Sequence, residues 1–275
     1  MEILKTNKSL VLDEENYISK NKLEVSNETS NETVKYSFYI TYAFLMTTAT
    51  VTFIEAIRTK DAKIRHILNL ETCISIVATF FYGMFITKIN EEQKEYENNL
   101  KKINASNPLK KKEKISKEMT LKEMNYKSIN NNRYIDWSIT TPIMLLVLIL
   151  AFSYNNKKNV ILWQFLIILV LNYGMLGAGY LGENKQINKV AATLIGFIFF
   201  LALYYYIYVT YIQDFKLFDN QIIYWSFFIF WALYGVVYWF NEKNKNIFYN
   251  ILDLFSKCFV GIFFWAYFTK TIVLS

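Results

Sequence analysis

The stretch IFYNILDLFSKCFVGIFFWAYF, residues 247–268, decides the fold because it is long, apolar and charged at its centre. A helix needs about 20 such residues to cross a bilayer. Lys257 lies ten residues from Ile247 and eleven from Phe268, so at about 1.5 Å per residue each membrane surface is about 15 Å away. A lysine side chain cannot reach that far. Lys257 therefore needs partners inside a helix bundle, and Asp253 lies one turn earlier on the same face.

Six further stretches are long and apolar enough to span a membrane. All seven predicted spans are approximately 36–57, 67–86, 134–152, 160–181, 190–212, 222–240 and 247–268. Most connections between them are short, which is typical of neighbouring antiparallel helices. The sequence therefore predicts an all-α membrane protein with a seven-transmembrane-helix bundle.

The composition supports this fold class. Hydrophobic residues make up 53% of the 275 residues and aromatic residues 18%, with a net charge of +7 and only two Cys. These values exclude a disulfide-stapled secreted module and a disordered chain. The mean hydropathy of +0.16 is low for a membrane protein, because it averages apolar runs with blocks of charge. Cys73 and Cys258 fall within predicted spans and are expected to be core residues.

Two polar segments lie outside the spans. Residues 1–35 lack the apolar core of a signal peptide and predict an N-terminal extension. The remainder, 36–275, is expected to be the helix domain, with a long charged insertion at about 87–132. The connection between spans one and two and the connection between spans three and four are both short. Together they carry six Lys and Arg residues, which predicts that both are cytoplasmic. They are Arg58, Lys60, Lys63, Arg65, Lys157 and Lys158. The N-terminus and the insertion would then be extracellular, and the C-terminus cytoplasmic.

A second set of polar residues lies in span three, within RYIDWSITTP at 133–142. Arg133, Asp136 and Thr140 are spaced i, i+3, i+7 and share one helix face. Ionisable groups inside a span are costly and usually functional. A plain salt bridge between helices is the alternative, although buried pairs rarely add stability. The carboxylates of Asp136 and Asp253 could hold a cation on Lys257, and a desolvated lysine readily forms a Schiff base with an aldehyde. These residues predict an aldehyde cofactor.

Four motifs together resemble a microbial (type I) rhodopsin, over about residues 36–268. They are RY-x-DW-x-x-TTP at 133–142, MLGAG at 175–179, W-x-x-Y at 231–234 with Tyr238, and D-x-x-SK at 253–257. Among the subfamilies, the chain is most similar to the rhodopsins of giant viruses that infect algae. A G-protein-coupled receptor is disfavoured because span seven has no NP-x-x-Y motif. The resemblance implies a bundle that encloses all-trans retinal, bound to Lys257 as a protonated Schiff base.

The resemblance also implies roles for individual residues. Asp136 would be the primary counterion and proton acceptor, and Asp253 the second counterion, with Arg133 tuning both. Thr140 would hydrogen-bond Asp136, while Tyr82 and Tyr234 would hydrogen-bond Asp253. The remaining residues implied to bind the cofactor are Trp137, Thr141, Met144, Asn172, Met175, Gly179, Gly196, Phe200, Trp231 and Tyr238.

The sequence departs from the pattern of the family's proton pumps. Val147 stands where those pumps have the carboxylate that returns a proton from the cytoplasm. Glu71, eleven residues before Tyr82 in span two, could be a relocated proton donor or a polar gate. Alternatively it faces the cytoplasmic interface near Arg65 and His66. The loop between spans six and seven lacks an evident Glu pair for proton release.

The expected function is light-activated ion transport without enzymatic activity. A light-gated cation channel is the first hypothesis, because the usual donor is missing while Glu71 and Asn172 place polar groups along the path. An outward proton pump that uses Glu71 as donor is the alternative, and a photosensor is the third. The expected partners are membrane lipid, the transported cations or protons, and further copies of the chain, since family members are commonly trimers or pentamers. No nucleic acid is expected.

Overall fold

The computed structural model describes residues 32–104, 126–215 and 217–271. Within them, seven helices are long and apolar enough to cross a membrane. These spans are Glu32–Arg58, Ala62–Glu95, Tyr126–Asn155, Leu162–Glu183, Lys189–Ile212, Phe218–Val237 and Glu242–Phe268. The predicted all-α, seven-span architecture is confirmed. Most of the predicted N-terminal extension and the middle of the insertion lie outside the described residues.

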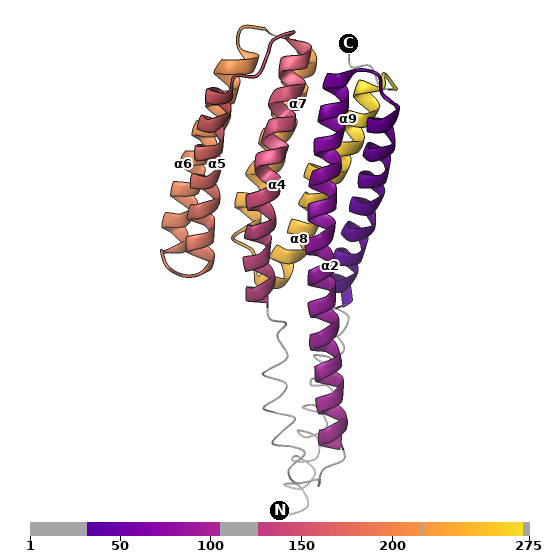
Figure 1. Cartoon of the computed structure of the whole chain (residues 1–275). Coiled ribbons are helices and arrows are strands. Elements are labelled where there is room, and N and C mark those ends of the chain that lie inside the picture. Colours follow the sequence, from indigo (N-terminus) through magenta and orange to yellow (C-terminus); the bar gives the residue numbers. More distant parts are fainter. Residues whose placement is uncertain (1–31, 105–125, 216, 272–275) are drawn as a thin grey trace, which may run out of the picture.

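The helices stand roughly parallel in one bundle (Figure 1). Helices α5 (Leu162–Glu183) and α6 (Lys189–Ile207) pair on one side, and α4 (Tyr126–Asn155) and α7 (Phe218–Val237) lie in the middle. On the other side are α2 (Ala62–Asn104), the first helix, and the last span. We call the end at which α2 projects the insertion end, and the opposite end the C-terminal end.

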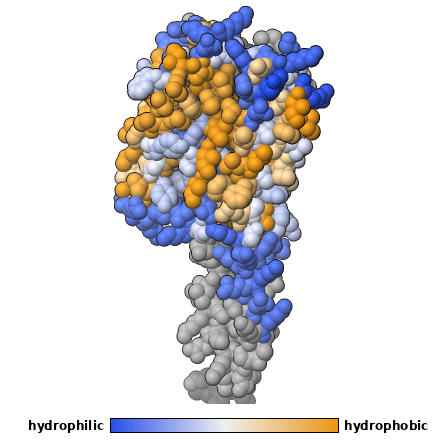
Figure 2. Space-filling model, in the orientation of Figure 1, coloured by the Kyte–Doolittle hydropathy of each residue, from blue (hydrophilic) through white to orange (hydrophobic). Residues whose placement is uncertain are grey.

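The surface is divided as a bilayer requires. Figure 2 shows apolar residues gathered across the middle of the bundle and hydrophilic residues at both ends. Large apolar side chains such as Trp163, Val170 and Ile198 are 70%, 67% and 67% exposed. In a water-soluble protein such a surface would be a liability, whereas lipid is its natural solvent.

Helix α2 is longer than its predicted span. It continues without a break from Ala62 to Asn104, well past residue 86, because residues 87–104 contain no Gly or Pro and many good helix formers. Helix α4 begins at Tyr126, eight residues before its predicted start at 134. The predicted insertion at 87–132 is therefore helical at both of its described ends.

The last span is not a uniform α-helix. It consists of α8 (Glu242–Asp253), the π-helical segment η2 (Leu254–Phe259) and α9 (Val260–Phe268). Span five also changes to a π-helix, η1 (Tyr208–Ile212), after α6. Short π-segments are rare and frequent at functional sites, and η2 contains Lys257.

Packing inside the bundle differs between its two ends. Toward the C-terminal end, the buried side chains are mostly apolar and form what we call the dry core. It includes Ile67, Leu68, Leu145, Val147, Leu148, Phe152 and Phe264, each at most 1% exposed. Toward the insertion end, the buried polar residues include Arg133, Asn246 and Asn250. Toward the C-terminal end, Glu71 and the hydrogen-bonded pair Thr52 and Thr72 are also buried, beside the dry core.

We expect Gly182→Ala to destabilise the bundle. A Cβ at Gly182 would lie 2.3 Å from Ala192 Cβ and 2.5 Å from the Tyr238 hydroxyl oxygen, so α5 would have to move away from α6. Such overpacking costs about 1–3 kcal/mol. Gly177→Ala is the matched control, because a Cβ there meets no atom within 4 Å. Thermal unfolding in detergent should show a lower Tm for Gly182→Ala alone, and equal Tm values would contradict this packing.

Candidate functional site

A buried ammonium group lies between two carboxylates at the centre of the bundle. Lys257 Nζ donates to Asp136 Oδ2 at 2.6 Å and lies 3.6 Å from Asp253 Oδ2. All three side chains are at most 1% exposed. Asp136 comes from α4, while Asp253 and Lys257 lie on one face of the last span. The fold therefore unites residues 121 positions apart in the sequence.

Two tyrosines fix the Asp253 carboxylate. The Tyr82 hydroxyl donates to Oδ2 at 2.8 Å, and the Tyr234 hydroxyl donates to Oδ1 at 2.6 Å. Tyr234 also shares a hydrogen bond of 2.8 Å with the Ser256 hydroxyl. Because hydrogen bonds from both sides favour the charged carboxylate, this arrangement suits a permanent anion next to Lys257.

Arg133 lies on the insertion side of this centre. Its Nη1 is 3.7 Å from Asp253 Oδ2 and donates to the Tyr82 hydroxyl at 3.2 Å. The other guanidinium nitrogens donate to the side-chain carbonyls of Asn250 and Asn246. Four aromatic rings surround the guanidinium within 5.1–5.7 Å, which adds cation–π attraction to a fully buried charge. They belong to Phe38, Tyr82, Phe85 and Tyr249.

The prediction that Thr140 hydrogen-bonds the Asp136 side chain is wrong. The Thr140 hydroxyl donates at 2.9 Å to the main-chain carbonyl of Asp136 instead. A threonine inside a helix can always reach the carbonyl four residues earlier, and in an apolar setting this local bond wins. Asp136 Oδ1 is buried and accepts no hydrogen bond from the described residues.

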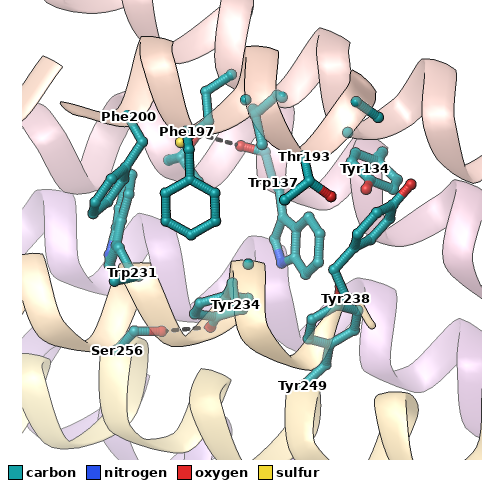
Figure 3. A pocket seen from close by; sticks show the side chains of 18 of the residues that line it. Tyr134, Trp137, Thr193, Phe197, Phe200, Trp231, Tyr234, Tyr238, Tyr249 and Ser256 are labelled. Atoms are coloured by element: carbon teal, nitrogen blue, oxygen red, sulfur yellow. Dashed lines mark hydrogen bonds between the residues drawn. The ribbon is translucent and has the colours of Figure 1, made fainter. Parts of the chain in front are cut away.

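Lys257 also forms part of the wall of a cavity between α4, α5, α6, α7 and the last span. Figure 3 shows other residues of this wall, among them Trp137, Trp231 and Tyr234. The cavity encloses about 860 Å³, including its open side. Ten of the expected cofactor-binding residues line it together with Lys257. They are Trp137, Thr141, Met144, Met175, Gly179, Gly196, Phe200, Trp231, Tyr234 and Tyr238.

Two expected lining residues lie elsewhere. Tyr82 belongs to the network around Asp253 and Arg133. Asn172 is fully buried behind the wall, where its Nδ2 donates to the Thr141 hydroxyl at 2.9 Å. This bond joins α5 to α4 next to the cavity.

Other lining residues escaped the sequence analysis. Tyr249 stacks on Tyr234 with ring centroids 5.7 Å apart, and it lies one turn before Asp253, so the helical spacing could have revealed it. Tyr134, Leu176 and Ser256 stand within the quoted motifs but received no role at the cavity. The other members of the wall are marked by no motif residue. They are Ala192, Thr193, Phe197, Ala232 and Gly235.

Glu71 is buried toward the C-terminal end of the bundle. Its side chain is 2% exposed, whereas Arg65 and His66 are exposed, so the interface-facing alternative for Glu71 is wrong. The carboxylate approaches Gly261 closely: a Cβ there would lie 3.1 Å from Glu71 Oε2 and 2.8 Å from Thr48 Cγ2. Gly261 lies four residues beyond Lys257, about one helical turn.

The sequence comparisons agree with this architecture. The bacteriorhodopsin-like protein family matches residues 32–271, so the chain belongs to that family. Among solved structures, the viral rhodopsin OLPVRII is similar, with 48% identity, a TM-score of 0.72, and coverage of 87% of this chain and 99% of that chain. The chain is therefore a microbial rhodopsin and resembles the viral members. No significant match was found among curated proteins.

More distant solved structures share the fold. Acetabularia rhodopsin I has 17% identity and a TM-score of 0.64, covering 87% of this chain and 95% of that chain. A blue light-absorbing proteorhodopsin from Med12 has 22% identity and a TM-score of 0.59, covering 86% of this chain and 97% of that chain.

Family membership implies an integral membrane protein with a retinal chromophore that serves light-driven ion transport. The residues present fit this group. Eight of the twenty residues that line the cavity are aromatic, as suits a conjugated apolar chain, and the wall holds a primary amine, Lys257. The buried Oδ2 atoms of Asp136 and Asp253 could balance a positive charge at that amine.

Proposed function

We propose that the chain is a light-driven outward proton pump in which Glu71 returns the proton from the cytoplasmic side. The observation that supports it is the position of Glu71, a buried carboxylate about one turn beyond Lys257 and bordered by the dry core. A path for metal ions would need a continuous polar lining. Transfer of a single proton needs only one carboxyl group that comes transiently within reach of the Lys257 nitrogen.

In this proposal Lys257 would hold all-trans retinal covalently through its side-chain nitrogen. Trp137 and Trp231 line the cavity and would orient the bound group, together with Tyr234 and Tyr238 from α7 and its C-terminal end. The group would supply light absorption and isomerisation, which would change the direction and the basicity of the Lys257 nitrogen.

Asp136 is the proposed proton acceptor. Its Oδ2 is 2.6 Å from Lys257 Nζ, a distance at which a proton can pass directly. Asp253 is held by two tyrosine hydroxyls and faces Arg133. It therefore stays an anion while Asp136 becomes neutral, and the centre never loses its charge balance.

Glu71 is the proposed donor to the same nitrogen on the opposite side. Gly261 leaves the space in which its carboxyl group packs against the last span. The positive residues of the short connections favour the C-terminal end as cytoplasmic. Proton uptake from that end and release at the insertion end gives outward transport.

A light-gated cation channel is the second candidate. It is favoured by the polar link from Asn172 to Thr141 beside the cavity, because this link places hydrogen-bonding groups along a possible ion path. The dry core argues against it.

We expect Lys257→Ala to remove the visible absorption band, because no amine remains for the chromophore. Lys257→Arg is the matched control: it keeps a cation between the carboxylates but cannot form the Schiff base. Absorption spectra after addition of retinal measure the band, and circular dichroism checks the fold. A visible band in either variant would overturn the assignment of Lys257.

The light-induced current should be outward at every membrane voltage. A pump is driven by light rather than by an ion gradient, so replacing external Na⁺ should leave the current unchanged. Patch-clamp recording of illuminated cells tests this. A current that changes sign at a voltage set by the cation gradient would contradict the proton pump and support the cation channel.

Glu71→Gln should slow recovery of the resting absorption after a flash by at least about tenfold, since a positioned acid contributes about 10²–10⁴-fold to proton transfer. Glu55→Gln is the control, because within the described residues the carboxylate of Glu55 forms an ion pair with the exposed Arg58 at 3.9 Å. Equal recovery rates in Glu71→Gln and the native chain would remove Glu71 from the donor role.

A further inference from the structure

A second buried lysine closes the insertion end of the bundle. Lys245 is 2% exposed, and its Nζ donates to Glu183 Oε1 at 2.8 Å, to Glu183 Oε2 at 3.1 Å and to Glu242 Oε1 at 2.8 Å. Glu183 ends α5, and Glu242 begins α8. The sequence shows no evident Glu pair at this end, because the two carboxylates come from different connections.

Every oxygen of these two carboxylates accepts an N–H group. Besides Lys245, Asn130 Nδ2 donates to Glu183 Oε1 at 2.6 Å and to Glu242 Oε2 at 2.7 Å. Donors from Lys245 and Asn130 therefore serve all four oxygens. Lys245 holds them together as a cation would.

The cation matters more for one carboxylate than for the other. Glu183 is the last residue of α5, where the helix dipole disfavours a negative charge. Glu242 lies in the first turn of α8, where the dipole favours it, and its side chain is 53% exposed. Glu183 is 11% exposed and depends on Lys245 for compensation. Two carboxylates and one ammonium leave a net charge of −1.

This cluster is connected to the charged centre. Arg133 Nε donates to Asn246 Oδ1 at 3.3 Å, and Asn246 Nδ2 donates to Asn130 Oδ1 at 3.1 Å. Asn130 in turn donates to both carboxylates. The chain of hydrogen bonds thus runs from beside Asp253 to the insertion end.

Beyond the cluster the molecule opens to the outside. A cavity of about 850 Å³, open on one side, is lined by Glu183, Glu242 and Lys245. Lys185 and Lys189 also line this cavity. The Nζ atom of Lys189 lies 5.0 Å from the ring centroid of Tyr238. An ion that entered this cavity would meet Lys245 before it could reach Arg133.

We propose that Lys245 is a tethered cation that fills a cation site at the mouth of the ion path and so keeps metal ions out of it. The proposal rests on the proposed outward proton path past Arg133. The site lies between Glu183 and Glu242, and its natural occupant is the lysine itself. Lys245 would then be a specificity-determining residue, because it leaves the exit to protons alone.

A lysine that only ties helices together would behave differently when it is replaced. A structural tie could be exchanged for an apolar contact with little other effect. A tethered cation leaves behind two carboxylates that bind a free cation. Oxygen ligands from Asp, Glu and Asn suit Ca²⁺, so Ca²⁺ is the probe.

The test compares Lys245→Met with Lys245→Arg in detergent, with and without Ca²⁺. For sites with Kd of about 10⁻⁴–10⁻³ M, ~10 mM Ca²⁺ should raise the Tm of Lys245→Met by at least about 3 °C. The native chain and Lys245→Arg should shift by less than about 1 °C. A folded Lys245→Met that ignores Ca²⁺, or a native chain that responds equally, overturns the proposal.

Two further variants keep the test decisive. Adding Glu183→Gln to Lys245→Met should abolish the Ca²⁺ response. If Lys245→Met folds only when Ca²⁺ is present, the proposal is supported. If Ca²⁺ does not restore its folding while the triple variant Glu183→Gln/Glu242→Gln/Lys245→Met folds, the carboxylates do not form a cation site, and the proposal fails.

The transport consequence is measured separately. In illuminated cells, Lys245→Met should carry a current that depends on external Na⁺, which the native chain should not. If the native chain carries no photocurrent at all, the proposed function fails, while the Ca²⁺ result still decides whether Lys245 fills a cation site.

Discussion

The structure depends on one buried charge, the ammonium of Lys257 at mid-membrane depth. Neither water nor a lipid head group can neutralise it there, so carboxylates must come to it from the protein. Asp253 approaches along the same helix, but Asp136 must be brought in by α4. Two anions then need a further cation, and Arg133 supplies it at 3.7 Å. The buried polar network around Arg133 is the consequence of this one placement.

Much of the fold was predictable because its cause is local. Each span is a long apolar run, and a helix is the simplest structure that satisfies its own backbone in lipid. Asp253 followed from its spacing to Lys257 on one helix, whereas the role of Asp136 at Lys257 followed from the resemblance to microbial rhodopsins. Helix ends were less predictable, because capping acts outside the apolar run. The last span begins at Glu242, five residues before its predicted start, since the Asn241 side chain accepts from Asn244 N and starts the helix early.

The rest of the site depends on contacts between helices, which spacing along one helix does not reveal. Asn246 and Asn250 accept hydrogen bonds from Arg133, and Asn130 accepts one from Asn246, yet Asn is so common in this chain that none of the three stood out. The wall from span five carries no motif. Thr140 had two acceptors within reach, and only the folded backbone showed which one it uses. Whether protons or metal ions pass is decided by packing, which no motif encodes.

The π-helical segment around Lys257 has a geometrical consequence for the whole last span. In an α-helix every fourth residue advances by about 40° around the axis, so Asp253, Lys257 and Gly261 would drift steadily away from one line. A segment with more residues per turn reverses that drift. The three positions therefore remain aligned along the bundle interior. The Asp253 carboxylate, the Lys257 amine and the space at Gly261 that admits Glu71 therefore follow one line. The π-helical segment corrects the angle of these residues around the helix axis and does not serve as a hinge.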